Sequence, residues 1–231
     1  MMIKVGCCGF PVAMQKYVKT FRVVEVQKTF YKPPDPETAE RWKLVAGSDF
    51  EFTVKAFQVI THPPSSPTYR KARLSLDDGG FFKPVRAVFH AWEKTREIAD
   101  ILGSDVIVFQ TPRSFSESGE NKRNMREFFS SIERDRFTFC WEPRGWSEEG
   151  IKEICEKLNL VHVVDPFLGK SVWGELKYFR LHGFNYRHKY TQDELEWLAE
   201  ETAKHRECYV MFNNVHMFDD AQRFMKLLKL L

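Results

Sequence analysis

Charged side chains recur at the ends of short apolar segments of this sequence. Glu25, Lys55, Glu142 and Arg180 each stand near the end of such a segment. Carboxylates beside cations can act as general acid or base, because partly desolvated neighbours can have well-separated pKa values. A guanidinium can hold a phosphate or carboxylate through two parallel hydrogen bonds. These residue types indicate acid–base chemistry on an anionic molecule.

Eight segments predicted to be strands must position these residues. They cover residues 3–8, 22–27, 50–56, 105–110, 137–142, 160–165, 176–182 and 207–213. Amphipathic, helix-like stretches lie between them at 36–46, 85–102, 122–133, 147–158, 191–204 and 215–231. Alternating strands and helices are typical of parallel βα units, and eight pairs predict an α/β fold, a TIM-type (β/α)8 barrel in one domain over 1–231.

Three connections depart from the regular pattern. Residues 11–20 leave room for only a short helix, and 166–174 resemble a loop. The segment at about 58–84, after the third strand, is rich in Pro, Ser, Gly and basic residues, which predicts a long loop. A loop of that length in a compact domain is usually functional or mobile.

The alternation of side chains along each strand predicts which residues face the barrel interior. In 137–142 the bulky Phe137, Phe139 and Trp141 should face the helices, which leaves Glu142 inside. The same test places a polar set inside, nearly all at strand ends: Glu25, Gln27, Lys55, Gln110, Asp165, Arg180, His182 and Asn213. Barrel interiors are normally apolar, so this convergence predicts a ligand site at the C-terminal mouth.

A second interpretation of the same residues is structural. Glu25, Lys55, Glu142 and Arg180 could neutralise one another as a buried ion-pair network. Such a network is a weak stabiliser and need not crowd the C-terminal strand ends, so we favour a ligand site.

At these residues the sequence resembles the DUF72 family, also called YecE-like. The matching segments, in order along essentially the whole chain, are VEVQKTFY at 24–31, FTVKAFQVITH at 52–62, VFQTP at 108–112, WEPRGW at 141–146, YFRLHG at 178–183 and YVMFNN at 209–214. Gln27 stands where the family pattern usually has Asn, which keeps an amide. The resemblance implies a TIM-type barrel and supports the site, but it implies no reaction or cofactor.

Our leading hypothesis is an enzyme that binds a phosphorylated or otherwise anionic sugar-like or nucleotide-like molecule. Its candidate acid–base residues are Glu142, His182 and Glu25. Its candidate ligand-binding residues are Lys55, Arg144, Arg180, Asn213, Gln110, Gln27, Tyr31, His62 and Asp165.

Two alternatives stay open. One is a phosphodiesterase or isomerase barrel that uses a divalent metal, with ligands among His62, His182, Glu142, Asp165 and Glu25. Lys55 and Arg180 would repel the cation, so we predict no cofactor, although a divalent metal remains possible.

The other alternative is a non-catalytic nucleic-acid-binding module. Residues 69–73 and 184–190 interleave basic and aromatic side chains, which suits phosphate contact and base stacking. We favour a solvated loop for both segments and therefore a small anionic molecule as the partner.

Bulk composition limits the remaining possibilities. The chain has 43% hydrophobic and 29% charged residues and a net charge of +3, which permits an anionic ligand without the strongly basic character of a dedicated nucleic-acid binder. No apolar run approaches the ~20 residues that span a bilayer, so no membrane association is expected. The N-terminus does not resemble a signal peptide, so we expect a cytoplasmic protein. The oligomeric state is left open.

Overall fold

The computed structural model describes residues 2–230, and its strands form a closed parallel barrel. The strands are β1 (Met2–Cys8), β2 (Val23–Val26), β3 (Glu51–Lys55), β4 (Val106–Gln110), β5 (Thr138–Glu142), β6 (Val161–Val164), β7 (Lys177–Leu181) and β8 (Glu207–Phe212). Each strand pairs with the next along the chain, and β8 pairs with β1 to close the ring. The predicted TIM-type barrel is confirmed.

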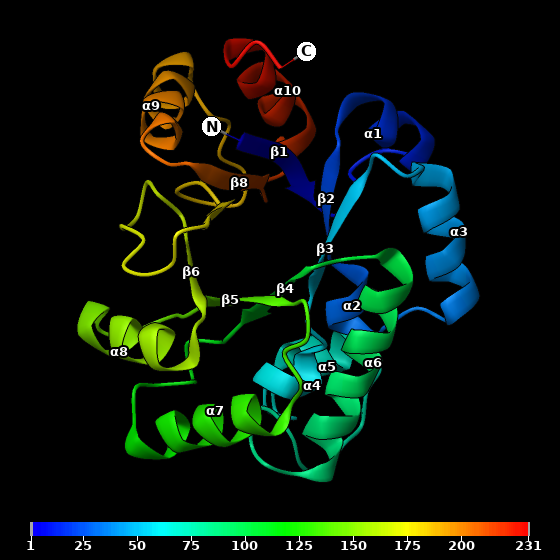
Figure 1. Ribbon diagram of the computed structural model, residues 1–231, viewed down its shortest axis with the longest axis vertical. Coiled ribbons are helices and arrows are strands. Elements are labelled where there is room, and N and C mark those ends of the chain that lie inside the picture. The colour runs from blue at the N-terminus through cyan, green and yellow to red at the C-terminus, as the bar shows by residue number, and fades with distance from the viewer. Residues whose placement is uncertain (1, 231) are drawn as a thin grey trace.

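Helices surround the strands (Figure 1). They are α1 (Met14–Thr20), α2 (Lys28–Tyr31), α3 (Pro36–Ala46), α4 (Gln58–Thr61), α5 (Pro67–Ala72), α6 (Arg86–Leu102), α7 (Gly119–Ser131), α8 (Glu148–Leu158), α9 (Gln192–Ala203) and α10 (Met217–Leu227). The last helix, α10, lies beside α9 and near β1, which brings the chain ends to the same side of the barrel. Within residues 2–230, none of the helices combines the length and apolar character needed to cross a bilayer.

The helix starts follow the local sequence. Thr191 and Glu194 form a reciprocal capping box at the start of α9, and the Ser147 side chain accepts a hydrogen bond from Gly150 at the start of α8. Pro36 occupies the first turn of α3, where its missing N–H has no cost. These helix starts set the length of the connections that lead from the preceding strands into α3, α8 and α9.

Two apolar layers support the strands, as the alternation of side chains predicts. The larger layer fills the space between strands and helices and includes Phe109, Phe139 and Trp141. The smaller one fills the barrel interior and consists of Cys8, Val23, Val106, Val108, Cys140, Val161, Val163, Tyr178, Tyr209 and Met211. Above this interior layer, at the carboxyl ends of the strands, the inward side chains become polar.

The segment 58–84 is more ordered than the predicted loop. It contains α4 and α5, and Phe82 is fully buried against Phe109 and Phe128 of the outer core. Gly80 has φ +77°, and a Cβ there would lie 2.3 Å from the carbonyl oxygen of His62, so the close return of the chain requires glycine. The sequence did not predict this order because the apolar residues of the segment, such as the pairs Val59–Ile60 and Phe81–Phe82, follow neither a helix nor a strand period.

The connection between β6 and β7 carries no helix among the described residues, as predicted. Backbone N–H groups of Leu168 and Gly169 donate to the carbonyl oxygen of Asp165, which folds the start of this connection into a tight turn. The start of the loop therefore lies at the mouth, and its later part runs back along the outward face of β6, where the backbone N–H of His162 donates to the carbonyl oxygen of Trp173.

Candidate functional site

The guanidinium of Arg180 holds two carboxylates at the mouth. Its Nε and Nη2 donate to the two oxygens of Glu25 at 3.0 and 2.9 Å, and its Nη1 donates to Glu142. Arg180 and Glu25 are 0% exposed. A bidentate arginine–carboxylate pair with both groups desolvated is rigid, because breaking it would leave an uncompensated buried charge. We call Glu25, Arg180 and Glu142 the carboxylate clamp.

Neutral groups complete the inner side of the clamp. Tyr178 donates its hydroxyl to Glu25 at 2.9 Å and lies 2.8 Å from the Thr53 hydroxyl, while the amide nitrogen of Gln27 donates to the other Glu25 oxygen. All the oxygens of Glu25 are therefore occupied by protein groups. Glu25 lies where the sequence predicts, but its contacts are those of a residue that orients Arg180.

Glu142 differs from Glu25 because its outer oxygen faces further groups. His182 Nε2 lies 3.2 Å from Oε1, the Gln110 amide donates to it at 3.3 Å, and Arg144 Nη2 lies 3.6 Å away. Burial alone would raise the pKa of Glu142, but Arg180, together with His182 and Arg144, holds that pKa well below its usual range. The carboxylate is therefore ionised near neutral pH.

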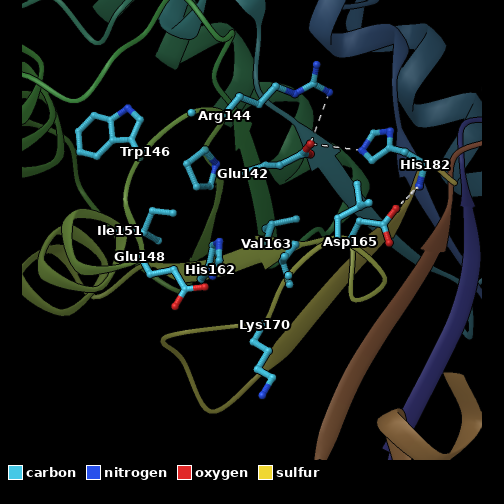
Figure 2. Close-up of a pocket in the computed structure, with 15 residues that line it drawn as sticks. Glu142, Arg144, Trp146, Glu148, Ile151, His162, Val163, Asp165, Lys170 and His182 are labelled. Atoms are coloured by element: carbon cyan, nitrogen blue, oxygen red, sulfur yellow. Dashed lines mark hydrogen bonds and ion pairs between the residues drawn. The ribbon is translucent and has the colours of Figure 1, made fainter. Parts of the chain in front are cut away.

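Asn213 and Asp165 both contact His182, and Figure 2 shows the contact with Asp165. The Asn213 amide nitrogen lies 3.2 Å from Nδ1, and the backbone N–H of His182 donates to Asp165 at 2.8 Å. An amide donor at Nδ1 leaves the ring proton on Nε2, facing Glu142. Burial raises the pKa of Asp165, although backbone N–H groups of His182, Phe167 and Gly183 oppose the shift.

Lys55 lies on the opposite side of the mouth, at the end of β3. Its ammonium donates to Gln110 at 2.5 Å and stands 3.9 Å from the centre of the Phe30 ring. Within residues 2–230 it has no carboxylate oxygen within 4.0 Å, so it is not a member of the predicted ion-pair network. Burial, and secondly Arg180, lower its pKa to about 7 against the opposing pull of Glu25 and Glu142.

His62 and Tyr31 belong to this second side. The His62 ring packs 4.9 Å from the Phe30 ring, and its Nδ1 lies 2.8 Å from the Thr61 hydroxyl. Burial, then Lys55 and Arg144, lower the pKa of His62 to about 3, so the ring is neutral. Tyr31 accepts a hydrogen bond from Lys71 at 3.3 Å.

A cavity of about 410 Å³ opens on the β5–β7 side of the mouth. Four sequence-predicted residues line it: Glu142, Arg144, Asp165 and His182. The lining adds Trp146, Glu148, Ile151, His162, Val163, Val164, Leu168, Gly169 and Lys170 with Pro143 and Gly145. The other predicted residues do not line it: Glu25, Lys55, Arg180, Gln110, Asn213, Gln27, Tyr31 and His62.

Sequence reasoning missed His162 and Lys170. His162 has the outward parity of β6, and its Nδ1 accepts a hydrogen bond from the backbone N–H of Val172 at 3.1 Å. Burial lowers its pKa to about 4, so His162 is neutral and presents Nε2–H as its donor. The sequence signal that could have identified His162 is a polar residue on the outward face of the strand, where the neighbouring residues are apolar.

The donor set does not fit the metal that the alternative hypothesis requires. Among residues 2–230 no three His, Cys, Asp or Glu side chains gather as metal ligands. The clamp binds Glu25 and Glu142 to Arg180, and His62 packs on Phe30, away from His182. A cation at Glu142 would also meet Arg180 and Arg144, and no step of chemistry is therefore assigned to a metal.

Fold and site together define a TIM-type barrel with a charged mouth at the carboxyl ends of its strands. The chain belongs to the family described as "Protein of unknown function DUF72", whose model matches residues 11–231. The resemblance seen in the sequence is thus confirmed.

Relatives share this architecture. The chain is 22% identical to the UPF0759 protein YunF of Bacillus subtilis over 94% of its own length and 86% of that protein. A crystallised DUF72 family protein from Enterococcus faecalis has a TM-score of 0.75 at 17% identity, covering 100% of this chain and 98% of that one. One from Thermotoga maritima has a TM-score of 0.69 at 20% identity, covering 99% and 100%.

More distant barrels share the fold alone. They include an AP endonuclease of family 2 from Brucella melitensis, with a TM-score of 0.57 at 11% identity over 99% of this chain and 98% of that one. An IOLI protein with a bound zinc atom has a TM-score of 0.54 at 9% identity over 100% and 97%. The fold therefore accommodates DNA-processing and zinc-binding proteins, and the chemistry must be argued from this chain's own residues.

Proposed function

We propose that this protein is an enzyme that binds a small anionic molecule, phosphorylated and sugar-like or nucleotide-like, in the cavity on the β5–β7 side of the mouth. The observation that carries the proposal is the position of Glu142. One of its oxygens belongs to the carboxylate clamp, and the residue also lines the cavity beside His182 and Arg144. A buried, oriented charge at the edge of a cavity is the arrangement that acid–base catalysis needs.

His182 is the proposed proton-transferring group. A carboxylate whose pKa is held well below its usual range is a weak base, so Glu142 is better suited to orient the imidazole and stabilise its protonated form. His182 lines the cavity with 26% of its side chain exposed, so it can reach a ligand. Glu25 and Arg180 act through Glu142 as positioning residues.

Arg144 is the proposed anion-binding group. Its side chain is 47% exposed, and its ion pair to Glu142, at 3.6 Å, is long enough to yield to a ligand phosphate. Lys170 stands at the opposite end of the cavity from Arg144 (Figure 2), where it can meet a second acidic group. The walls between them, including Trp146, Ile151 and Val163, are apolar enough for a sugar or base.

Binding to a phosphate panel tests this proposal. Calorimetry with inorganic phosphate, sugar phosphates and nucleoside monophosphates should give a ligand whose affinity falls about 10-fold or more in Arg144→Ala, because one charge-assisted contact is lost. Arg41→Ala, an exposed arginine on α3, is the matched control and should bind normally. Equal binding by both variants would remove Arg144 from the site, and no binding by any phosphate would end the proposal.

A nucleic-acid ligand is the second candidate, supported by one specific observation. In the loop after β7, Phe184 is 69% and Tyr186 63% exposed, next to the exposed Arg187 and Lys189. The segment 69–73 offers less, because Tyr69 is buried and donates its hydroxyl to His62. Fluorescence anisotropy with a single-stranded oligonucleotide would support this candidate only if binding falls steeply with salt and on Phe184→Ala.

A further inference from the structure

Lys55 is a buried amine that the proposed acid–base chemistry does not use. The neighbouring carboxylates, Glu25 and Glu142, are both bound to Arg180, and Lys55 has neither as an ion-pair partner within 4.0 Å. Its hydrogen-bond acceptor is the neutral amide of Gln110, and its ammonium also lies over the face of Phe30. A structural lysine at this depth would ordinarily be paired with a carboxylate.

Burial and a nearby cation are conditions that favour the neutral form of a lysine. Desolvation and a second cation nearby both disfavour the ammonium form, and they lower the pKa of Lys55 to about 7. An unperturbed lysine is neutral in only about one molecule in 2,500 at pH 7, whereas an amine with a pKa near the pH is neutral in about half. The neutral amine has the lone pair that attacks a carbonyl carbon.

We propose that Nζ of Lys55 forms a Schiff base with a small aldehyde or ketone that carries an anionic group. The inference rests on the proposed function, since the anion would be held in the same mouth, and it names the substrate class. The amine attacks the carbonyl carbon, a C–N bond forms, and a proton passes from nitrogen to oxygen. Uptake of one further proton, from solvent or protonated His182, releases water as the C–O bond breaks and leaves a protonated imine.

Gln110 connects this amine to the cavity. Its amide oxygen accepts from Lys55 at 2.5 Å, and its amide nitrogen donates to Glu142, a cavity-lining residue, at 3.3 Å. Gln110 is only partly buried, so its side chain can move aside. The amine now donates to the amide carbonyl of Gln110, and a substrate carbonyl entering from the cavity would replace that amide carbonyl.

Phe30 suits the product of this reaction. Its ring centre lies 3.9 Å from Nζ, so a protonated imine formed at that nitrogen keeps a favourable cation–π contact. The same contact blocks one direction of approach, so a carbonyl would approach from the side that the Gln110 amide now occupies. Phe30 is thus a positioning residue for the amine.

Reductive trapping tests the inference on the wild-type protein. Pyridoxal 5′-phosphate, a phosphorylated aldehyde, is added in limiting amount at pH 7, reduced with borohydride, and located by peptide mapping. We expect Lys55 to be labelled roughly 10-fold faster than Lys152, an exposed lysine on α8, because far more of its amine is neutral. Inorganic phosphate should protect Lys55 and leave Lys152 unaffected.

The outcomes separate the two proposals. Labelling of Lys55 that phosphate suppresses supports both. Labelling that phosphate leaves unchanged supports the Schiff base and contradicts the anion site. An unlabelled Lys55 in protein that binds phosphate by calorimetry overturns the Schiff base alone, and an unlabelled Lys55 without phosphate binding overturns both. Lys55→Arg, whose guanidinium forms no imine under these conditions, should carry no label at this position, whereas Lys152 should be labelled as in wild type.

Discussion

Burial leaves an ionised group on one side of the mouth and favours neutral groups on the other. On the β5–β7 side Glu142 is buried yet ionised, because Arg180 lies against it and lowers its pKa. On the β2–β3 side Lys55 and His62 have their pKa values lowered by burial, which in a base favours the neutral form. The same loss of water therefore preserves a charge where a partner is present and removes it where the neighbours are Phe30 and an amide.

Removing Arg180 should have the largest effect, because it abolishes the difference between the sides. Arg180→Met leaves Glu25 and Glu142 buried without a cation, and we expect a loss of about 3–5 kcal/mol in the free energy of unfolding. Urea denaturation at pH 7 measures it. The triple variant Arg180→Met, Glu25→Gln, Glu142→Gln should recover much of the loss, since no unpaired charge remains. If Arg180→Met alone were as stable as wild type, Arg180 would not be needed to neutralise Glu25 and Glu142.

Removing Lys55 should increase the free energy of unfolding, whereas removing Arg180 should decrease it. A base whose folded pKa is lowered to about 7 binds fewer protons folded than unfolded from pH 7 up to about 10, so wild-type stability should rise over that window. Lys55→Met removes the group and should be more stable at pH 7 by on the order of 2–4 kcal/mol, with the difference shrinking toward pH 10. Denaturation curves at pH 7, 8.5 and 10 test this, and a variant less stable than wild type at pH 7 would contradict it.

His162 should have a smaller, local effect. His162→Phe removes the acceptor of the Val172 N–H and should cost about 1–3 kcal/mol. Because the folded pKa of His162 is lowered to about 4, its contribution to wild-type stability is present above the unfolded pKa of about 6.5 and is lost as pH falls between the two values. The variant should lack that part of the acid dependence, as denaturation at pH 7 and pH 4.5 would reveal. An unchanged slope would mean that folding does not lower the pKa of His162.

Strand periodicity was enough to predict the barrel and most of its mouth. Side-chain alternation placed Glu142, Arg180 and His182 on the interior face because bulky residues such as Phe139 and Trp141 mark the other one. Arg144 and Lys170 lie in connections, where no periodicity applies, and only Arg144 was identified, within a family segment.

The pairing of charges was not predictable from the sequence. The alternation of side chains shows that the interior contains Glu25, Lys55, Glu142 and Arg180. It does not show which of the two cations pairs with the carboxylates. That choice depends on register around the ring, where Gln110 of β4 lies beside Glu142 and between it and Lys55. His162 was missed because the alternation along its strand predicts an outward side chain. Its place in the cavity depends on the β6–β7 connection, which forms part of the same lining.

A single NMR titration tests the contrast between the two sides most directly. In one sample labelled with ¹³C at lysine Cε and glutamate Cδ, the Lys55 and Glu142 resonances, assigned with Lys55→Arg and Glu142→Gln, are followed from pH 4 to 11. Lys55 should titrate near pH 7, as its lowered pKa of about 7 requires, and Glu142 should remain ionised to the lowest pH reached. A Lys55 signal that titrates only above about pH 10, or a Glu142 signal that titrates above about pH 4.3, would match unperturbed groups and contradict the contrast.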